Sequence, residues 1–266
     1  MKMANEQNRE EKRQYILSRI QEMCYFDDVF MTKCLENYPT GIELMLRIIM
    51  NDHTLVVKEA QVQSVIKSLQ GRSIRMDVKA TDLKKKEYDV EMQRADSGAR
   101  PKRARYSSSL IDANAILPGD DTELLPETYV IFITENDVLR GNLPIYHVER
   151  MIKENGKLFD DKSHIIYVNG EIKDETPLGK LMQDLSCANP NEMNYKELAD
   201  RARFFKKDEE GRKIMSKIME EIINHEKIEV AERMLDDGEI SVDKIAKYLE
   251  LPVEVVKELA DNLQLV

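Results

Sequence analysis

Hydrophobic and polar residues alternate along two neighbouring stretches of the chain, residues 74–79 and residues 88–93. In both stretches every second residue is apolar, and the residues between are charged or carry an amide. A period of two residues predicts β-strands with apolar side chains on one face and polar side chains on the other. The charged loop between the two stretches predicts an antiparallel hairpin.

A hairpin that is symmetric about Lys84 places Asp77 opposite Glu91. The other opposed pairs in this register are Lys79 with Asp89 and Arg75 with Gln93. Opposed residues have Cβ atoms about 4.5–5.5 Å apart, so two carboxylates there repel each other. A magnesium ion removes this repulsion, because it takes oxygen ligands. The loop of residues 81–87 has no glycine to fix the turn, and a slip of one residue would turn one carboxylate to the other face.

Outside the hairpin, the pattern predicts helices mixed with strands. Apolar residues at helical spacing predict helices at residues 5–24, 27–36 and 102–115. Beyond an interruption at Pro39, Thr40 and Glu43 form a capping box that opens another helix. Apolar runs predict strands at residues 55–57, 62–66, 129–134, 145–148 and 164–168. We expect a mixed sheet with flanking helices.

Beyond Pro177 the pattern is helical almost to the end of the chain. Helices are predicted at residues 178–185, 195–205, 211–235, 240–249 and 252–259. The last two resemble a helix-turn-helix unit. The second helix and its continuation contain Glu254, Glu258 and Asp261 but only one lysine, Lys257. An acidic helix repels phosphate. This favours a packing or partner-binding module over a DNA reader.

Composition indicates a soluble globular protein, with 42% hydrophobic and 34% charged residues among 266. No apolar run reaches the roughly 20 residues of a membrane span. The polar start, residues 1–13, lacks the apolar core of a signal peptide, so we expect a cytoplasmic protein. Three widely separated cysteines suit a reducing compartment.

The net charge of −10 is unevenly distributed. Residues 67–106 contain twelve Lys or Arg and six acidic residues, a local charge of +6, whereas residues 208–266 carry −8. A basic segment around a carboxylate pair suits a protein that acts on a phosphodiester. The acidic total therefore does not exclude DNA as a partner.

Asp77 followed by Glu91-Met92-Gln93 on the next strand resembles the signature of PD-(D/E)XK nucleases, in the variant where glutamine replaces lysine. More narrowly, the chain resembles the recombination-promoting nuclease / putative transposase family over roughly residues 26–175. The phrases that carry this resemblance are Asp28–Phe30, Met76–Thr81, Tyr88–Gln93, Arg103–Tyr106 and Tyr129–Thr134. The chain departs from the family in the loop of residues 82–87, which lacks the usual glycine, and in the stretch through Gly98 and Pro101.

The resemblance implies an α/β (α+β) fold: a restriction-endonuclease-like mixed β-sheet core flanked by helices, with an all-helical C-terminal region. The expected parts are an N-terminal helical arm at residues 1–25, a nuclease-like domain at 26–175 and a helical region at 176–266. The implied activity is metal-dependent DNA cleavage, linked to a mobile element or to DNA recombination.

The resemblance also implies a site. Asp77 and one oxygen of Glu91 would hold Mg²⁺ or Mn²⁺, with the Met92 carbonyl as a further ligand, and the ion would activate a water. Gln93 would orient that water without supplying the charge of a lysine. The residues expected to contact DNA are Arg75, Arg94, Arg103, Arg105 and Tyr106.

Alternatives stay open at this point. The polar face of the hairpin is also what a solvated β-ribbon would have. Glu43 has a second interpretation as an additional metal ligand, beside that of a helix cap. The rival function is a catalytically silent DNA-binding or protein-interaction module with the same fold, whose acidic helical tail binds a protein partner or a second copy.

Overall fold

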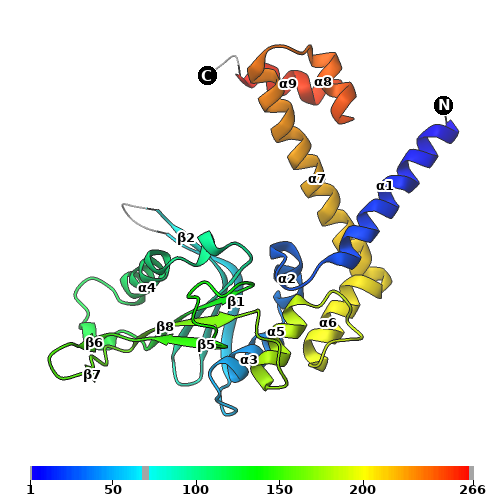
Figure 1. Cartoon of the computed structure of the whole chain (residues 1–266). Helices are drawn as coiled ribbons and strands as arrows, with labels where there is room; N and C mark the ends of the chain where they lie inside the picture. The colour runs from blue at the N-terminus through cyan, green and yellow to red at the C-terminus, as the bar shows by residue number, and fades with distance from the viewer. Residues whose placement is uncertain (1, 68–71, 264–266) are drawn as a thin grey trace. The chain divides into compact units, whose positions relative to one another are not determined.

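A six-stranded mixed sheet with strand order β1-β2-β3-β4-β8-β5 organises residues 21–203 (Figure 1). The computed structural model describes residues 2–67 and 72–263. The strands of this sheet are β1 (Val57–Ile66), β2 (Ile74–Asp82), β3 (Glu87–Gln93), β4 (Thr128–Thr134), β5 (Ile145–Val148) and β8 (Ser163–Asn169). A small hairpin of β6 (Met151–Ile152) and β7 (Lys157–Leu158) surrounds the turn at residues 155–156. The expected mixed sheet with flanking helices is confirmed.

The β2–β3 hairpin has the register that symmetry about Lys84 predicts. Its pairs are Val78 with Val90, Lys79 with Asp89, Ala80 with Tyr88 and Thr81 with Glu87. The turn closes without glycine, because Lys85 adopts a left-handed φ of 64° and the Lys86 amide donates to Asp82 at 2.9 Å. Backbone pairing ends at Val78 and Val90, one residue before Asp77 and Glu91.

The two short strands expected at residues 55–57 and 62–66 are in fact one strand, β1. It pairs antiparallel with β2 from Val57 to Ile66. The polar residues in the middle break the apolar run in the sequence, but they do not break the strand, because β2 offers backbone partners along this whole length.

Helix α4 (Pro101–Ala115) connects β3 to β4, which run parallel to each other. A parallel connection needs a crossover of this kind, and it places the helix over one face of the sheet. Short 3₁₀ turns precede and follow α4, at Asp96–Ala99 and Thr122–Leu124. The apolar side of α4 packs with β4, where all seven residues are buried as the continuous apolar run predicts.

The N-terminal part of this unit contains α2 (Asp28–Leu35) and α3 (Pro39–Ile49). The predicted capping box is wrong: α3 begins at Pro39, and its N-cap residue Tyr38 makes no side-chain cap. Proline fits the first helical turn because the amide that it lacks has no partner there. Glu43 instead accepts a hydrogen bond from the Val57 amide at 2.9 Å and pairs with Arg47 at 2.8 Å.

Helices α5 (Pro177–Ser186) and α6 (Lys196–Lys207) follow the sheet. The unit of residues 21–203 contains α5 and most of α6. The Tyr25 hydroxyl donates to the Leu198 carbonyl at 2.9 Å, and Arg201 Nε donates to the Cys34 carbonyl at 3.1 Å. These helices therefore help to build the core beside the sheet.

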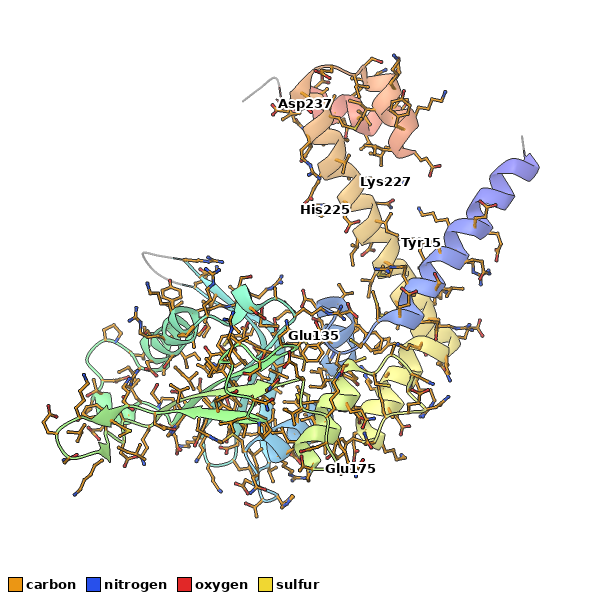
Figure 2. All side chains as sticks on the ribbon, viewed as in Figure 1. Tyr15, Glu135, Glu175, His225, Lys227 and Asp237 are labelled. Atoms are coloured by element: carbon orange, nitrogen blue, oxygen red, sulfur yellow. The ribbon has the colours of Figure 1, made fainter. Side chains whose placement is uncertain are left out.

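The second compact unit combines Met1–Ile20 with Phe204–Val266. It contains most of α1 (Lys2–Glu22), the long α7 (Glu209–Asp237), α8 (Val242–Leu249) and α9 (Val253–Leu263). Gly238, at a φ of 68°, ends α7. An apolar cluster joins α7, α8 and α9, and Lys227 on α7 reaches Glu250 at 3.5 Å (Figure 2). Within residues 2–67 and 72–263, no helix is both long enough and apolar enough to cross a membrane.

Candidate active site

Three acidic side chains lie together on the face of the sheet that α4 covers. Strand alternation places Asp77 of β2 on this face with Asp89 and Glu91 of β3. The charges of these groups affect one another, because Asp77 raises the pKa of both Asp89 and Glu91. The sequence predicts Asp77 and Glu91 as a pair, and the structure brings both to one site.

Backbone amides beyond the end of the β2–β3 pairing bind these carboxylates. Asp77 Oδ2 accepts a hydrogen bond from the Met92 amide at 2.9 Å. In turn, the Asp77 amide stabilises the Glu91 carboxylate. Each carboxylate thus interacts with a backbone amide of the opposite strand. These two interactions fix where the carboxylates lie.

Burial makes this group of acids electrostatically unfavourable. Asp89 is fully buried and Glu91 is 1% exposed. Burial is the main cause that raises the pKa of Asp77 to about 6, and the charge of Asp28 adds to it. Burial, with the charge of Asp77, raises the pKa of Glu91 to about 7. A solvated β-ribbon is therefore the wrong interpretation for this face of β3.

Asp89 is the member of this group that sequence reasoning missed. Both of its carboxylate oxygens are buried without a hydrogen-bond partner among the residues that the structure describes. Burial raises its pKa well above the ordinary value, and the charges of Glu91 and Asp77 raise it further. The alternation of β3 places Asp89 beside Glu91, but only the packing of α4 shows that it is buried.

Glu91 also has two side-chain donors on one oxygen atom. Gln93 Nε2 donates to Glu91 Oε2 at 3.2 Å, and Arg103 Nη2 of α4 donates to the same oxygen. The Arg103 guanidinium lies 5.9 Å from the centre of the Phe132 ring, in cation–π contact. The Gln93 carbonyl oxygen packs against Gly98, where an added Cβ would lie 1.8 Å from it.

The other predicted DNA contacts are exposed or have partners outside the acidic group. Arg75 pairs with Asp28 at 3.4 Å and Arg94 pairs with Asp27 at 3.2 Å. The Tyr106 hydroxyl donates to the Arg72 carbonyl, and Arg105 is exposed. The side chains of Arg75 and Arg94 are 61% and 47% exposed. Exposed ion pairs of this kind contribute little, so a phosphate can replace the carboxylate partner.

Asp28 is a further acidic residue, close to the group of Asp77, Asp89 and Glu91. Its carboxylate accepts a hydrogen bond from Gln63 of β1 at 2.7 Å and pairs with Arg75. Its negative charge raises the pKa of Asp77. The sequence pointed to Glu43 as an additional acid, whereas the structure brings Asp28 of α2 near Asp77.

The donor set suits a hard divalent cation that keeps some of its water. Among the residues that the structure describes, no group of three or more His, Cys, Asp or Glu side chains could hold a metal ion by itself. Magnesium needs fewer protein ligands, commonly one or two carboxylates together with waters and a substrate phosphate. The Asp77 and Glu91 carboxylates fit that arrangement.

Comparison with known proteins gives one match. The model of a family described as PD-(D/E)XK nuclease family transposase matches residues 42–176, about half of the chain. The matched segment contains all six strands of the sheet and the acidic group described above. No curated protein and no solved structure matches the chain.

Proposed function

Because this chain belongs to the PD-(D/E)XK nuclease family of transposases, we propose that it is a metal-dependent DNA endonuclease of a mobile element or of DNA recombination. The observation that carries the proposal is the carboxylate pair of half-buried Asp77 and buried Glu91, whose mutual repulsion a cation would relieve. PD-(D/E)XK nucleases generally use divalent metal ions.

Each site residue has a role in this proposal. Asp77 and one oxygen of Glu91 would hold Mg²⁺ or Mn²⁺, and the Met92 carbonyl would be a further ligand. A cation bound there neutralises charge on the scissile phosphate and lowers the pKa of the attacking water. Gln93 uses one N–H on Glu91, and its second N–H and its carbonyl lone pairs are enough to orient that water.

The basic segment supplies the contacts to DNA. Arg75 and Arg94 have exposed guanidinium groups, and Arg105 and Tyr106 continue along α4. The charge of Arg75 acts on the carboxylates of Asp77 and Glu91. Phosphate contacts of this kind position a duplex without reading its sequence. The acidic α9 is assigned no role in DNA binding, because its carboxylates repel phosphate.

Cleavage of supercoiled plasmid tests the proposal. The purified protein is expected to nick or linearise plasmid with Mg²⁺ or Mn²⁺, to stop in EDTA and to lose this activity on Asp77→Asn. Cleavage that persists in EDTA, or equal cleavage by Asp77→Asn, would contradict it. A folded protein that binds DNA but never cleaves it would favour the silent DNA-binding module.

A further inference from the structure

Arg103 contacts the acidic group directly, although the sequence predicts it as a contact to DNA. Its Nη2 donates to Glu91 Oε2, and its side chain is 39% exposed while that of Glu91 is 2% exposed. A buried carboxylate needs such donors, because an unpaired buried charge is costly. In the folded protein, Arg103 therefore pairs with Glu91.

The neighbouring residues hold Arg103 in this place. Glu91 pairs in register with Phe132 on β4, and the guanidinium lies over the ring of that phenylalanine. Arg103 is the third residue of α4, which starts at Pro101. The crossover that brings α4 over β3 and β4 thus sets the arginine above both strands at the level of Glu91.

Gln93 supplies the second donor to the same oxygen, at 3.2 Å. Gly98 makes room for it, since a Cβ at position 98 would lie 1.8 Å from Gln93 Oε1. A carboxylate oxygen has about two lone-pair sites, so Arg103 and Gln93 occupy both sites of Oε2. The other oxygen, Oε1, has no side-chain donor within the described part of the chain. Beside the Asp77 amide, which also stabilises this carboxylate, it keeps room for a cation.

We propose that Arg103 is a positioning residue, which together with Gln93 fixes Glu91 Oε2 and so directs Oε1 toward the cation beside Asp77. This inference rests on the proposed function, because it takes Asp77 and Glu91 as the metal ligands. Partners of this kind orient a ligand, and their loss commonly weakens metal binding about 10- to 100-fold.

Simple electrostatics predicts that the loss of Arg103 changes the metal affinity in the opposite direction. Removal of a positive charge next to a cation site should strengthen cation binding. If Arg103 positions Glu91, its removal leaves Gln93 and the Asp77 amide to orient the carboxylate. They fix its orientation less firmly than all three donors together, and metal binding weakens. The sign of the change in metal affinity therefore separates the two accounts.

The test is Mn²⁺ binding to the full-length, DNA-free protein, measured from the electron paramagnetic resonance signal of the free ion. We expect Arg103→Ala to bind Mn²⁺ about 10- to 100-fold more weakly than wild type. Lys102→Ala, which removes a charge from the neighbouring position of α4, should stay within about two-fold. Arg103→Lys keeps the charge without the planar fork and should lie between Arg103→Ala and wild type. Circular dichroism checks that each variant is folded.

Three results would overturn the inference. The first is that both Arg103→Ala and Arg103→Lys bind Mn²⁺ as tightly as wild type, or more tightly. Arg103 would then not position Glu91. The second is that Mn²⁺ affinity is unchanged while DNA binding is weaker, and the slope of log DNA affinity against log salt concentration is smaller in magnitude by about 1. Arg103 would then be a phosphate contact. A wild-type protein that binds no Mn²⁺ would overturn the proposed function and this inference together.

Discussion

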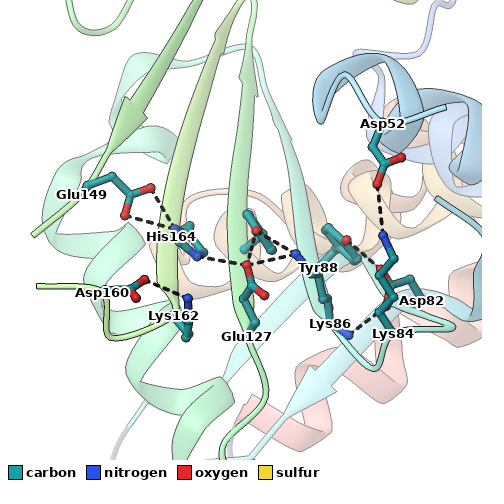
Figure 3. A network of polar contacts seen from close by, with 11 residues as sticks. Asp52, Asp82, Lys84, Lys86, Tyr88, Glu127, Glu149, Asp160, Lys162 and His164 are labelled. Atoms are coloured by element: carbon teal, nitrogen blue, oxygen red, sulfur yellow. Dashed lines mark hydrogen bonds and ion pairs between the residues drawn. The ribbon is translucent and has the colours of Figure 1, made fainter. Parts of the chain in front are cut away.

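Two groups of polar side chains lie on strands β2, β3, β4 and β8 and beside them, and they differ in how many of their carboxylate oxygen atoms accept hydrogen bonds. One group lies where β3, β4 and β8 begin and centres on Tyr88, Tyr129 and His164, which occupy one row of the sheet and stack on one another (Figure 3). The other is the acidic group of Asp77, Asp89 and Glu91.

The carboxylates of the first group are well supplied with donors. Glu127 accepts hydrogen bonds from Tyr129 and from Lys86, the latter at 3.0 Å, and lies 3.4 Å from His164 (Figure 3). These hydrogen bonds and charges outweigh burial and lower the pKa of Glu127. Asp82 accepts from the Tyr88 hydroxyl at 3.1 Å and from the Lys86 amide. The carboxylates of this group are thus complete without a ligand, although His164 Nε2 is buried without a hydrogen-bond partner among the residues that the structure describes.

The acidic group is not complete in this sense. Burial raises the pKa of all three of its carboxylates, and within residues 2–67 and 72–263 Asp89 has no hydrogen-bond partner. Native proteins satisfy most buried polar atoms, so unsatisfied ones point to function. The comparison indicates that the first group aligns the strands, whereas the second is built to receive positive charge.

The largest expected effect is loss of cleavage when a metal-binding carboxylate is removed. Asp77→Ala and Glu91→Gln should lower the rate at saturating Mg²⁺ on the order of 10³-fold, because several kcal/mol of charge stabilisation are lost. Glu127→Gln, in the complete group, should cleave plasmid like wild type. Equal losses in all three variants would mean that the two groups do not differ in function.

A smaller effect is expected at Gln93. Gln93→Ala should cleave about 10²-fold more slowly, since it loses a group that orients the attacking water, and Gln93→Lys should keep or raise activity because it adds positive charge. Gly98→Ala should resemble Gln93→Ala, because its Cβ displaces the Gln93 amide. Plasmid cleavage rates measure all three variants. If both Gln93→Ala and Gly98→Ala cleaved at the wild-type rate, Gln93 would have no role in catalysis.

Stability should change in opposite directions in the two groups. At pH 8 without metal, Asp89→Asn should raise the free energy of unfolding by about 1–3 kcal/mol, because the unfolded chain ionises Asp89 freely whereas burial in the folded protein opposes its charged form. Glu127→Gln should lower it by about 1 kcal/mol, because it weakens hydrogen bonds to a charged acceptor. Urea unfolding of both variants measures the difference. Destabilisation by Asp89→Asn would contradict the claim that Asp89 is unsatisfied.

The pH dependence of the free energy of unfolding should also differ in direction between the two groups. The folded-state pKa values of Asp77 and Glu91 are about 6 and 7, above their ordinary values of 3.8 and 4.5. The folded protein then binds more protons than the unfolded chain, so metal-free stability should fall as pH rises from about 4 through 7. Glu127 acts in the opposite sense: its contribution is present above its ordinary pKa and is lost as pH falls. Mg²⁺ should reduce the loss of stability near pH 7.

Local patterns predicted much of this fold and part of the site. Alternation and symmetry about Lys84 were enough for the β2–β3 register, and the apolar run of residues 129–134 was enough for a buried central strand. Asp77 and Glu91 follow from that register. The start of α3 was missed because proline breaks a helix only in its interior, and at residue 39 it occupies the first turn.

The rest depends on packing between residues that are distant in the sequence. No local pattern reveals that α4 lies over β3, and that packing both buries Asp89 and brings Arg103 onto Glu91. Likewise, the pairing of Arg75 with Asp28 spans 47 positions of the chain. Charge alone therefore predicted these arginines as contacts to DNA, and their carboxylate partners became visible only in the folded chain.

Crystals soaked in Mn²⁺ and measured at the manganese absorption edge test the central claim most directly. We expect an anomalous difference peak between the carboxylates of Asp77 and Glu91, at Mn–O distances of roughly 2.0–2.3 Å, and no peak at Glu127. The same soak of Asp77→Asn crystals should lose the peak. A Mn²⁺ ion bound at Glu127, or a soaked wild-type crystal with no density between Asp77 and Glu91, would contradict the account.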